Sequence, residues 1–238
     1  MMANKRQNAS KKQPQEQDTL MRLLSRISQL VAQNKRKVYG SLSVIVIIGV
    51  VVLGFHHFER LAEDKAYTLF DQGLTTYLNS ESKEQAKSSD ELRIKDFDEV
   101  LQRYPKTNAA RLTSLAYGNY YYNKEQYDKA IALYTQAFQA SHEYPLMQAF
   151  ILNSIGCCYE EKKDYKTASE YFLKVIDLED GFLKDMAHFH LGRVYEAIGD
   201  KPAALMHYKK VVEDYPESIH FQSANSRISH LESALHAS

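Results

Sequence analysis

The sequence predicts an all-α protein in which one N-terminal transmembrane helix precedes an α-solenoid of helical hairpins. Two observations support this prediction. Residues 38–58 form an apolar stretch without a formally charged residue, which has the length of a membrane-spanning helix. Further along, one pattern of small and aromatic residues recurs at spacings of 38 and 36 residues, which is typical of stacked helical hairpins.

The recurring pattern is a glycine followed by a tyrosine after three residues, an alanine after twelve and an aromatic residue after sixteen. Its three copies are Gly118, Tyr121, Ala130 and Tyr134; Gly156, Tyr159, Ala168 and Phe172; and Gly192, Tyr195, Ala204 and Tyr208. Small residues let two antiparallel helices approach closely, and the aromatic rings fill the space beside them. One hairpin cannot bury its own apolar face, so neighbouring copies are expected to stack. The alternative is a set of ordinary amphipathic hairpins whose spacing is coincidental.

Charge is distributed unevenly along the chain. Residues 1–37 contain nine Lys/Arg and two Asp/Glu, a formal charge of +7, whereas the rest contains 21 Lys/Arg and 28 Asp/Glu, a formal charge of −7. The two parts are therefore expected to face different surroundings.

The basic leader divides into two segments. Residues 1–17 are polar and almost free of apolar side chains, which predicts a disordered tail. Residues 18–37 predict an amphipathic helix on the cytoplasmic side, because apolar residues recur there at three- and four-residue steps. These residues are Leu20, Leu23, Leu24, Ile27, Leu30 and Val31. This helix either lies on anionic lipid or simply leads into the membrane.

Residues 38–58 are predicted to be an uncleaved membrane anchor. A helix of this length spans about 30 Å, the thickness of the hydrocarbon core of a bilayer. A cleaved signal peptide is the competing interpretation, but a small-residue cleavage site would then follow the apolar stretch. The bulky residues 55–58 stand there instead. Because basic residues stay on the cytoplasmic side, the N-terminus is expected in the cytoplasm and residues 59–238 outside it.

Residues 59–238 are predicted to form the repeat domain. It contains a degenerate unit at 59–107, repeats at 111–144, 149–182 and 185–218, and a capping helix at 221–235. In the degenerate unit Arg93 replaces the small residue, and the Ser-rich segment Asn79–Asp90 is expected to be a loop. Ala224, Ile228, Leu231 and Leu235 lie on one stripe of the last helix, as expected for a cap.

The sequence contains no nucleophile motif, phosphate-binding loop or metal-ligand motif, which predicts a protein without enzymatic activity, cofactor or metal. An acidic exported domain also disfavours nucleic acid as a partner. Cys157 and Cys158 are adjacent, so a disulfide between them would be strained. Cys158 is expected in the core, and Cys157 is either a packing residue or a redox-sensitive thiol. His188, His190 and His207 are interpreted as packing or surface residues rather than metal ligands.

The small–aromatic–small–aromatic order and the period resemble tetratricopeptide repeats, whose period is about 34 residues. The resemblance implies a concave groove, lined by the first helix of each hairpin, that holds a peptide or a partner helix. Carrying over the register places twelve residues there: Leu112, Leu115, Asn119 and Tyr122; Phe150, Asn153, Cys157 and Glu160; Met186, Phe189, Arg193 and Glu196. Some members bind C-terminal carboxylates through Lys and Asn; Asn119 matches, but Leu115 stands where the Lys is needed, so this mode is not expected.

The layout of residues 18–238 resembles the YfgM-type ancillary proteins of the bacterial inner membrane. That resemblance implies a single-pass protein with a periplasmic repeat domain that accompanies the Sec translocon. Its partners would be translocon subunits and a membrane-anchored periplasmic chaperone or prolyl isomerase that helps exported proteins fold. Two other classes stay open: a scaffold of another cell-envelope complex, such as outer-membrane assembly or cell division, and an enzyme with an unrecognised site.

Overall fold

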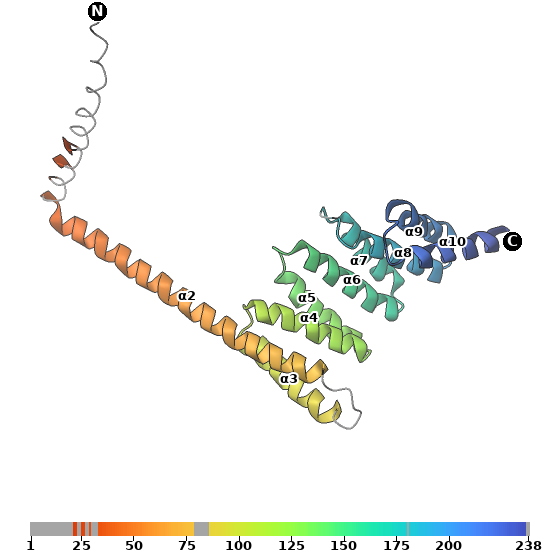
Figure 1. The fold of residues 1–238 in the computed structure, drawn as a ribbon, viewed down its shortest axis with the longest axis horizontal. Coiled ribbons are helices and arrows are strands. Elements are labelled where there is room, and N and C mark those ends of the chain that lie inside the picture. Colours follow the sequence, from red (N-terminus) through yellow and green to blue (C-terminus); the bar gives the residue numbers. More distant parts are fainter. Residues whose placement is uncertain are drawn as a thin grey trace, which may run out of the picture. The chain divides into compact units, whose positions relative to one another are not determined.

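A computed structural model of the chain describes residues 21–22, 25–26, 29, 33–78, 86–179 and 181–236. The described residues form α-helices joined by short turns, without a β-strand among them, which confirms the predicted all-α class (Figure 1). The helices are α2 (Lys35–Leu78), α3 (Ala86–Arg103), α4 (Asn108–Asn123), α5 (Tyr127–Gln139), α6 (Pro145–Glu161), α7 (Tyr165–Asp177), α8 (Lys184–Ala197), α9 (Lys201–Asp214) and α10 (Phe221–His236). The chain divides into two units, residues 1–59 and 60–238.

The N-terminal unit contains the first part of α2. This helix is long and apolar enough to cross a membrane, and the predicted span 38–58 lies inside it. Its large apolar side chains between residues 42 and 58 are exposed, a surface that suits lipid rather than water. The predicted tail 1–17 lies outside the described residues, as do most of the apolar positions of the predicted helix 18–37.

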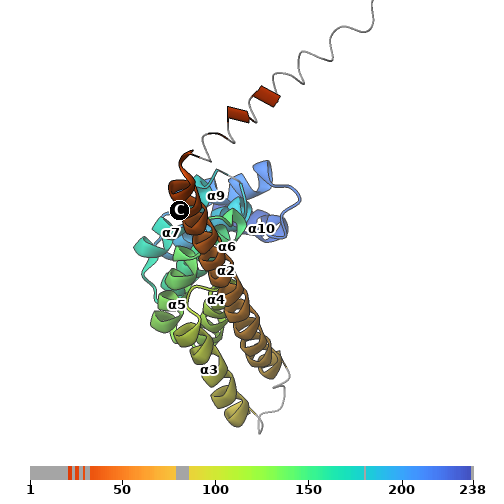
Figure 2. The same cartoon turned by 90° about the vertical axis from the view of Figure 1, so that its left-hand side faces the viewer.

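The C-terminal unit is a succession of antiparallel hairpins. Helices α4 and α5, α6 and α7, and α8 and α9 form three of them, and each packs on the next. Figure 2 shows the same succession from a second direction. Stacking of this kind lets every hairpin bury the apolar face that it cannot bury alone.

The recurring glycines lie directly against the recurring aromatic rings. A Cβ atom on Gly118, Gly156 or Gly192 would come within 2.5–2.6 Å of the Tyr134, Phe172 or Tyr208 ring, closer than real Cβ atoms approach other groups. Only glycine permits this contact between the two helices of a hairpin. The degenerate repeat at 59–107 keeps it as well: a Cβ on Gly73 would lie 2.6 Å from Phe97.

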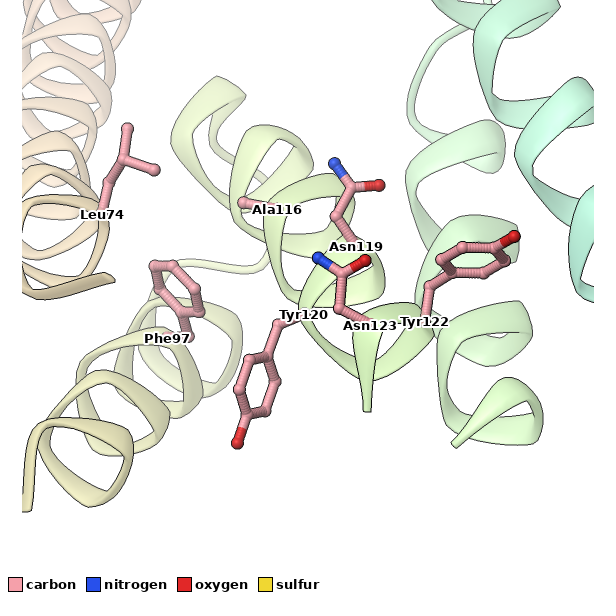
Figure 3. A pocket seen from close by; sticks show the side chains of 7 residues that line it. All are labelled: Leu74, Phe97, Ala116, Asn119, Tyr120, Tyr122 and Asn123. Carbon is pink, nitrogen blue, oxygen red and sulfur yellow. The ribbon is translucent and has the colours of Figure 1, made fainter. Parts of the chain in front are cut away.

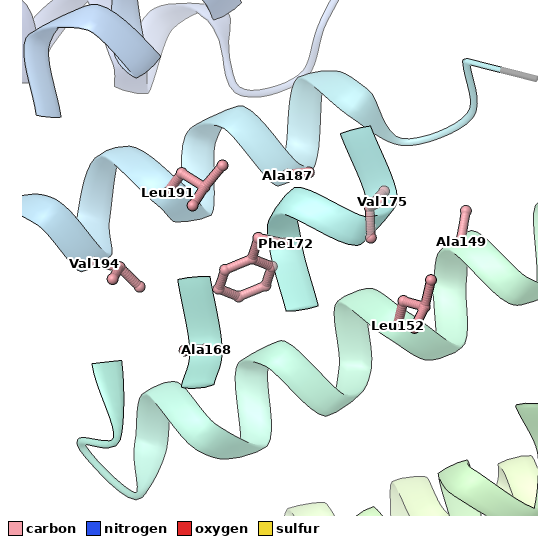
Figure 4. Packing of buried hydrophobic residues seen from close by; sticks show 8 residues of the cluster. All are labelled: Ala149, Leu152, Ala168, Phe172, Val175, Ala187, Leu191 and Val194. Carbon is pink, nitrogen blue, oxygen red and sulfur yellow. The ribbon is translucent and has the colours of Figure 1, made fainter. Parts of the chain in front are cut away.

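The cores lie between successive helices. The largest one contains residues of α6, α7 and α8: Ala149, Leu152, Ala168, Phe172, Val175, Ala187, Leu191 and Val194 (Figure 4). At the C-terminal end, Ala224, Ile228 and Leu231 of α10 pack on Tyr208 and Val211 of α9. Helix α10 therefore covers the apolar face of the last hairpin.

The loop predicted at Asn79–Asp90 is wrong in its second half, because α3 already begins at Ala86. Ser88, Ser89 and Asp90 belong to the first turns of this helix. Ser and Asp are common both in loops and near helix N-termini, so the composition of this segment could not separate the two.

Helix α4 begins at a cluster of hydrogen-bond acceptors. Thr107 Oγ1 accepts from the backbone N–H of Ala110 at 3.0 Å. The carboxylate of Glu63, on α2, accepts from the N–H groups of Asn108 and Ala109, at 3.0 Å each. These bonds satisfy donors that a helix leaves without internal partners, and they connect the last part of α2 to the hairpin α4–α5.

Candidate protein-binding surface

The first helices of the hairpins, α4, α6 and α8, present two rows of polar or aromatic side chains. Row one stands one residue after each repeat glycine and consists of Asn119, Cys157 and Arg193. Row two stands four residues after each glycine and consists of Tyr122, Glu160 and Glu196. Positions three apart share one face of a helix, so the two rows are expected to run side by side across the stack.

Helix α10 continues row one. Ser226 stands 34 residues after Gly192, and Arg227 is therefore the counterpart of Arg193. Helix α10 packs on α9 and occupies the position of the first helix of a further hairpin. The surface formed by α4, α6, α8 and α10 is called the inner surface below.

The rows pair across neighbouring helices. Arg193 Nη2 lies 2.9 Å from Glu160 Oε1, and Arg227 Nη1 lies 3.3 Å from Glu196 Oε1. In both cases row two of one hairpin contacts row one of the next. The corresponding pair between α4 and α6, Tyr122 and Cys157, is uncharged. Burial, and to a smaller extent the neighbouring Cys157, raises the pKa of the Tyr122 hydroxyl. The inner surface is therefore neutral and aromatic near α4 and carries ion pairs near α8 and α10.

The aromatic residues of the second helices also orient these rows. The Tyr134 hydroxyl donates to Asn119 Oδ1 at 2.6 Å, and the Tyr208 hydroxyl donates to Glu196 Oε2 at 3.0 Å. Phe172 has no hydroxyl at the equivalent position; its ring stacks on His190, with centroids 4.9 Å apart and planes 9° from parallel. The rings that fill the space beside the glycines thus fix side chains on the inner helices.

Two cavities lie along the inner helices. One of about 310 Å³ is lined by Leu74, Phe97, Ala116, Asn119, Tyr120, Tyr122 and Asn123 (Figure 3). Another of about 520 Å³ is lined by Glu160, Glu161, Lys163, Tyr165, Arg193, Glu196, Ala197 and Arg227. The first offers aromatic rings and amides, and the second offers paired charges, so the two cavities suit different parts of a bound segment.

The twelve predicted groove residues differ in their surroundings. Phe150 is 40% exposed and stands seven residues before Cys157, a spacing that puts both on one helix face. Leu112 and Met186, at the equivalent positions of α4 and α8, are partly buried. Leu115 packs against the core of α5 and α6. Phe189 stacks on His220, with ring centroids 4.6 Å apart, and also contacts Tyr208.

Asn153, Cys157, Glu160, Arg193 and Glu196 form one connected set through α6 and α8. Asn153 is buried and directs its amide nitrogen to Cys157 Sγ. The sequence-based list missed Arg227 and His190, which complete this set. Arg227 could have been found from its distance of 34 residues from Arg193, whereas nothing in the sequence shows that His190 lies near Cys157.

Burial decides the chemistry of the cysteines. Cys158 is fully buried in the core. Burial, and to a smaller extent the carboxylate of Glu160, raises the pKa of the Cys157 thiol to about 12. Since the thiolate is the reactive form, this environment argues against the redox-sensitive thiol that the sequence left open.

His188 and His207 form a separate pair, with their Nδ1 atoms 3.0 Å apart. The His207 ring also stacks on Tyr195, with centroids 5.4 Å apart. Burial, and secondarily the neighbouring His188, lowers the pKa of His207 to about 4. His207 is therefore neutral in the folded protein at neutral pH and belongs to the packing of α8 on α9.

Comparisons with known proteins agree with this architecture. Tetratricopeptide-repeat family models match residues 108–178 and residues 186–218. A search of curated proteins gave no significant match. Among solved structures, a crystal structure of MamA is similar, with 20% sequence identity, a TM-score of 0.51, and coverage of 65% of this chain and 83% of that chain. A second crystal structure of MamA protein gives 18% identity, a TM-score of 0.52, and coverage of 71% and 84%.

At these identities the solved structures show a similarity of fold alone. The family matches coincide with the hairpins α4–α5, α6–α7 and α8–α9, in which the glycine–aromatic contacts recur. Residues 108–178 and 186–218 of this chain are therefore tetratricopeptide repeats.

Proposed function

We propose that this protein is a membrane-anchored adaptor whose inner surface binds a segment of a partner protein. The anchor is a single helix in the bacterial inner membrane, with the basic leader in the cytoplasm and the repeats in the periplasm. The adaptor accompanies the Sec translocon and assists a membrane-anchored chaperone or prolyl isomerase with exported proteins. Tetratricopeptide repeats are protein-interaction modules, and this general class supports the proposal.

The observation that carries the proposal is the continuity of the inner surface over successive hairpins. Rows one and two connect α6 to α8 and α8 to α10 through the ion pairs Arg193–Glu160 and Arg227–Glu196. The ion pairs hold Glu160 and Glu196 in fixed positions before a partner arrives. Pre-ordered side chains lower the entropy cost of binding, so this surface is suited to hold an extended or helical segment.

Exposed apolar side chains extend the same surface toward the N-terminal ends of the inner helices. Leu146 is 53% exposed and Phe150 is 40% exposed, one turn apart on α6. Aromatic anchors of this kind contribute much of the binding energy at protein interfaces. We therefore place the apolar part of the partner on α6 and its polar part next to Glu160 and Arg193.

The membrane anchor raises the effective concentration at which the adaptor meets its partner. A tethered binding site meets its partner at a raised effective concentration, without any additional contact. The +7 leader and the apolar segment after it support an orientation with the repeats outside the cytoplasm. A surface of moderate affinity is then sufficient, because the partner emerges close to the site.

The proposal is tested by site-specific photo-crosslinking in membranes. The photoreactive residue replaces Phe150 or, in a separate variant, Tyr122. Translocon subunits, a periplasmic chaperone or exported chains are the expected products. Crosslinks confined to outer-membrane assembly or cell-division proteins would instead identify a scaffold of another envelope complex. An intact fold without crosslinks at either position would show that the inner surface does not bind a partner.

A matched pair of substitutions separates binding from folding. Phe150 and Leu173 are 40% and 39% exposed, but Leu173 lies on α7, the second helix of its hairpin, which carries neither row one nor row two. Phe150→Glu should lower crosslinking from Tyr122 by about tenfold or more, because aromatic anchors typically contribute about 2 kcal/mol. Leu173→Glu should leave it unchanged. Phe189 is a poor choice for this test because it packs on Tyr208 and His220.

A further inference from the structure

A thiol, an imidazole and a carboxylate converge between α6 and α8. Cys157 and Glu160 are three residues apart on α6 and share one face of it. His190 reaches them from α8: its Nε2 lies 3.8 Å from Cys157 Sγ, and its Nδ1 lies 3.5 Å from Glu160 Oε2. One potential ligand atom from each residue lies within 4.8 Å of the other two.

These separations are close to those of a metal site. Bonds of about 2.3 Å to sulfur and about 2.05 Å to nitrogen around a tetrahedral ion place the two ligand atoms about 3.6 Å apart. Cys157 Sγ and His190 Nε2 are 3.8 Å apart without any ion. The stacking of His190 on Phe172 fixes the plane of the imidazole, so its nitrogen already points in a defined direction.

Two buried polar atoms around this cluster make no hydrogen bond. Asn153 is only 6% exposed, and its Oδ1 makes no hydrogen bond, while its Nδ2 is directed to Cys157 Sγ at 3.8 Å. His190 Nδ1 is also buried without a hydrogen bond. Buried polar groups without partners cost free energy. Metal binding would strengthen the contact from Asn153 Nδ2 to Cys157 Sγ, because an amide donates more strongly to a thiolate than to a thiol.

We propose that Cys157, Glu160 and His190 form a binding site for a borderline-soft divalent metal ion of the zinc class. The thiol loses its proton to solvent as the sulfur–metal bond forms, the neutral imidazole binds through Nε2, and the carboxylate supplies the third ligand. Oxygen-seeking ions such as Mg²⁺ and Ca²⁺ prefer all-oxygen sites, whereas sulfur, nitrogen and oxygen together suit zinc.

The charge of the site fits such an ion. A thiolate and a carboxylate neutralise a divalent cation, which matters because the Glu160 and His190 side chains are only 11% and 12% exposed. In the metal-free protein Arg193 supplies the positive charge beside Glu160. The metal ion and Arg193 therefore compete for the same carboxylate.

This competition connects the metal site to the inner surface. Glu160 and Arg193 line the cavity of about 520 Å³, so water or a partner side chain can occupy the fourth position of the ion from that side. Release of Arg193 would also change the pairing of charges that a partner meets. The sequence could not reveal this site, because Cys157 and His190 are 33 residues apart and share no ligand motif.

The test is a titration of the full-length, untagged chain in detergent with Co²⁺, which replaces zinc and reports thiolate ligation by a charge-transfer absorption band. The chain has two cysteines, so the band has two possible sources. Wild type and Cys158→Ala should show the band, and Cys157→Ala should lose it. Glu160→Gln replaces a direct anionic ligand and should weaken cobalt binding by about tenfold or more, since loss of an outer-shell partner alone costs that much. Arg193→Gln should bind more tightly than wild type.

A second readout excludes loss of the fold as the cause. Zn²⁺ should raise the thermal unfolding temperature of wild type and of Cys158→Ala, since binding to the folded state stabilises it, and should leave that of Cys157→Ser unchanged. Folded wild type without a thiolate band at saturating Co²⁺ would overturn the proposal. A band that persists in Cys157→Ala, or binding that weakens in Arg193→Gln, would overturn it as well. Partner crosslinking from Phe150 is measured separately, so a failure of either proposal is distinguishable.

Discussion

The contact between each repeat glycine and an aromatic ring is the residue-level basis of the fold. Gly192 is the sharpest case, because the Tyr208 ring beneath it is fully buried and its hydroxyl is held by Glu196. Gly192→Ala places a Cβ within 2.5 Å of that ring and should lower the free energy of unfolding by about 1–3 kcal/mol. Gly54→Ala meets no atom within 4 Å and is the control. Equal denaturant midpoints for the two variants would contradict this account.

His207 makes the stability of the repeats depend on pH. Its pKa is about 4 in the folded protein, against the ordinary value of 6.5, so the unfolded chain binds a proton more readily than the folded one. The contribution of His207 is complete above pH 6.5 and is lost as pH falls toward 4, by up to about 1.4 kcal/mol per pH unit. His207→Gln should therefore show a shallower loss of unfolding free energy between pH 6.5 and 4.5. Chemical denaturation at several pH values measures the slopes; identical slopes would exclude the effect.

At the scale of elements, the turns inside the hairpins share one backbone conformation. Glu125, Lys163 and Gly199 each stand seven residues after a repeat glycine, and all have positive φ, at 59°, 61° and 86°. A residue other than glycine is destabilising there by about 1–2 kcal/mol. Glycine removes this strain, but it lowers the stability by about 0.4–1 kcal/mol because the unfolded chain gains conformational freedom. Lys163→Gly should thus stabilise the domain by up to about 1 kcal/mol.

The control for this substitution is Glu170→Gly, which introduces the same residue at an exposed position inside α7. Glycine inside a helix costs about 1 kcal/mol relative to good helix formers. The midpoint of urea unfolding should therefore rise for Lys163→Gly and fall for Glu170→Gly. If both lower the midpoint by the same amount, the left-handed turn is not under strain.

The sequence predicted those helices that contact each other within a single hairpin. Glycine and aromatic residues 16 positions apart predicted the hairpins, because the contact is made within one unit. In the degenerate repeat at 59–107 the same contact joins Gly73 to Phe97, 24 positions apart, and composition misplaced the start of α3 in between. Contacts between units depend on the stacking geometry, so the pairing of Glu160 with Arg193 and the approach of His190 to Cys157 appear only in the structure.

At the scale of the whole molecule, the proposed function requires the leader and the repeats to lie on opposite sides of a membrane. The leader carries nine of the 30 Lys/Arg residues, with Lys35, Arg36 and Lys37 directly before the apolar stretch. Moving this cluster across a bilayer is unfavourable, and basic segments next to a membrane helix remain in the cytoplasm. The acidic repeat unit carries no comparable cluster at its start. The expected orientation has the repeats on the opposite face.

Protease accessibility tests this orientation. Protease added to spheroplasts should digest residues 59–238 and leave a small, membrane-protected N-terminal fragment, detected with an epitope at the N-terminus. Permeabilised membranes are the control, in which the leader should be cleaved as well. Full protection of the repeats in intact spheroplasts would place them in the cytoplasm and exclude periplasmic partners. Release of an intact soluble repeat unit before protease is added would show that residues 38–58 are a cleaved signal, and the tether that raises the local concentration would then be absent.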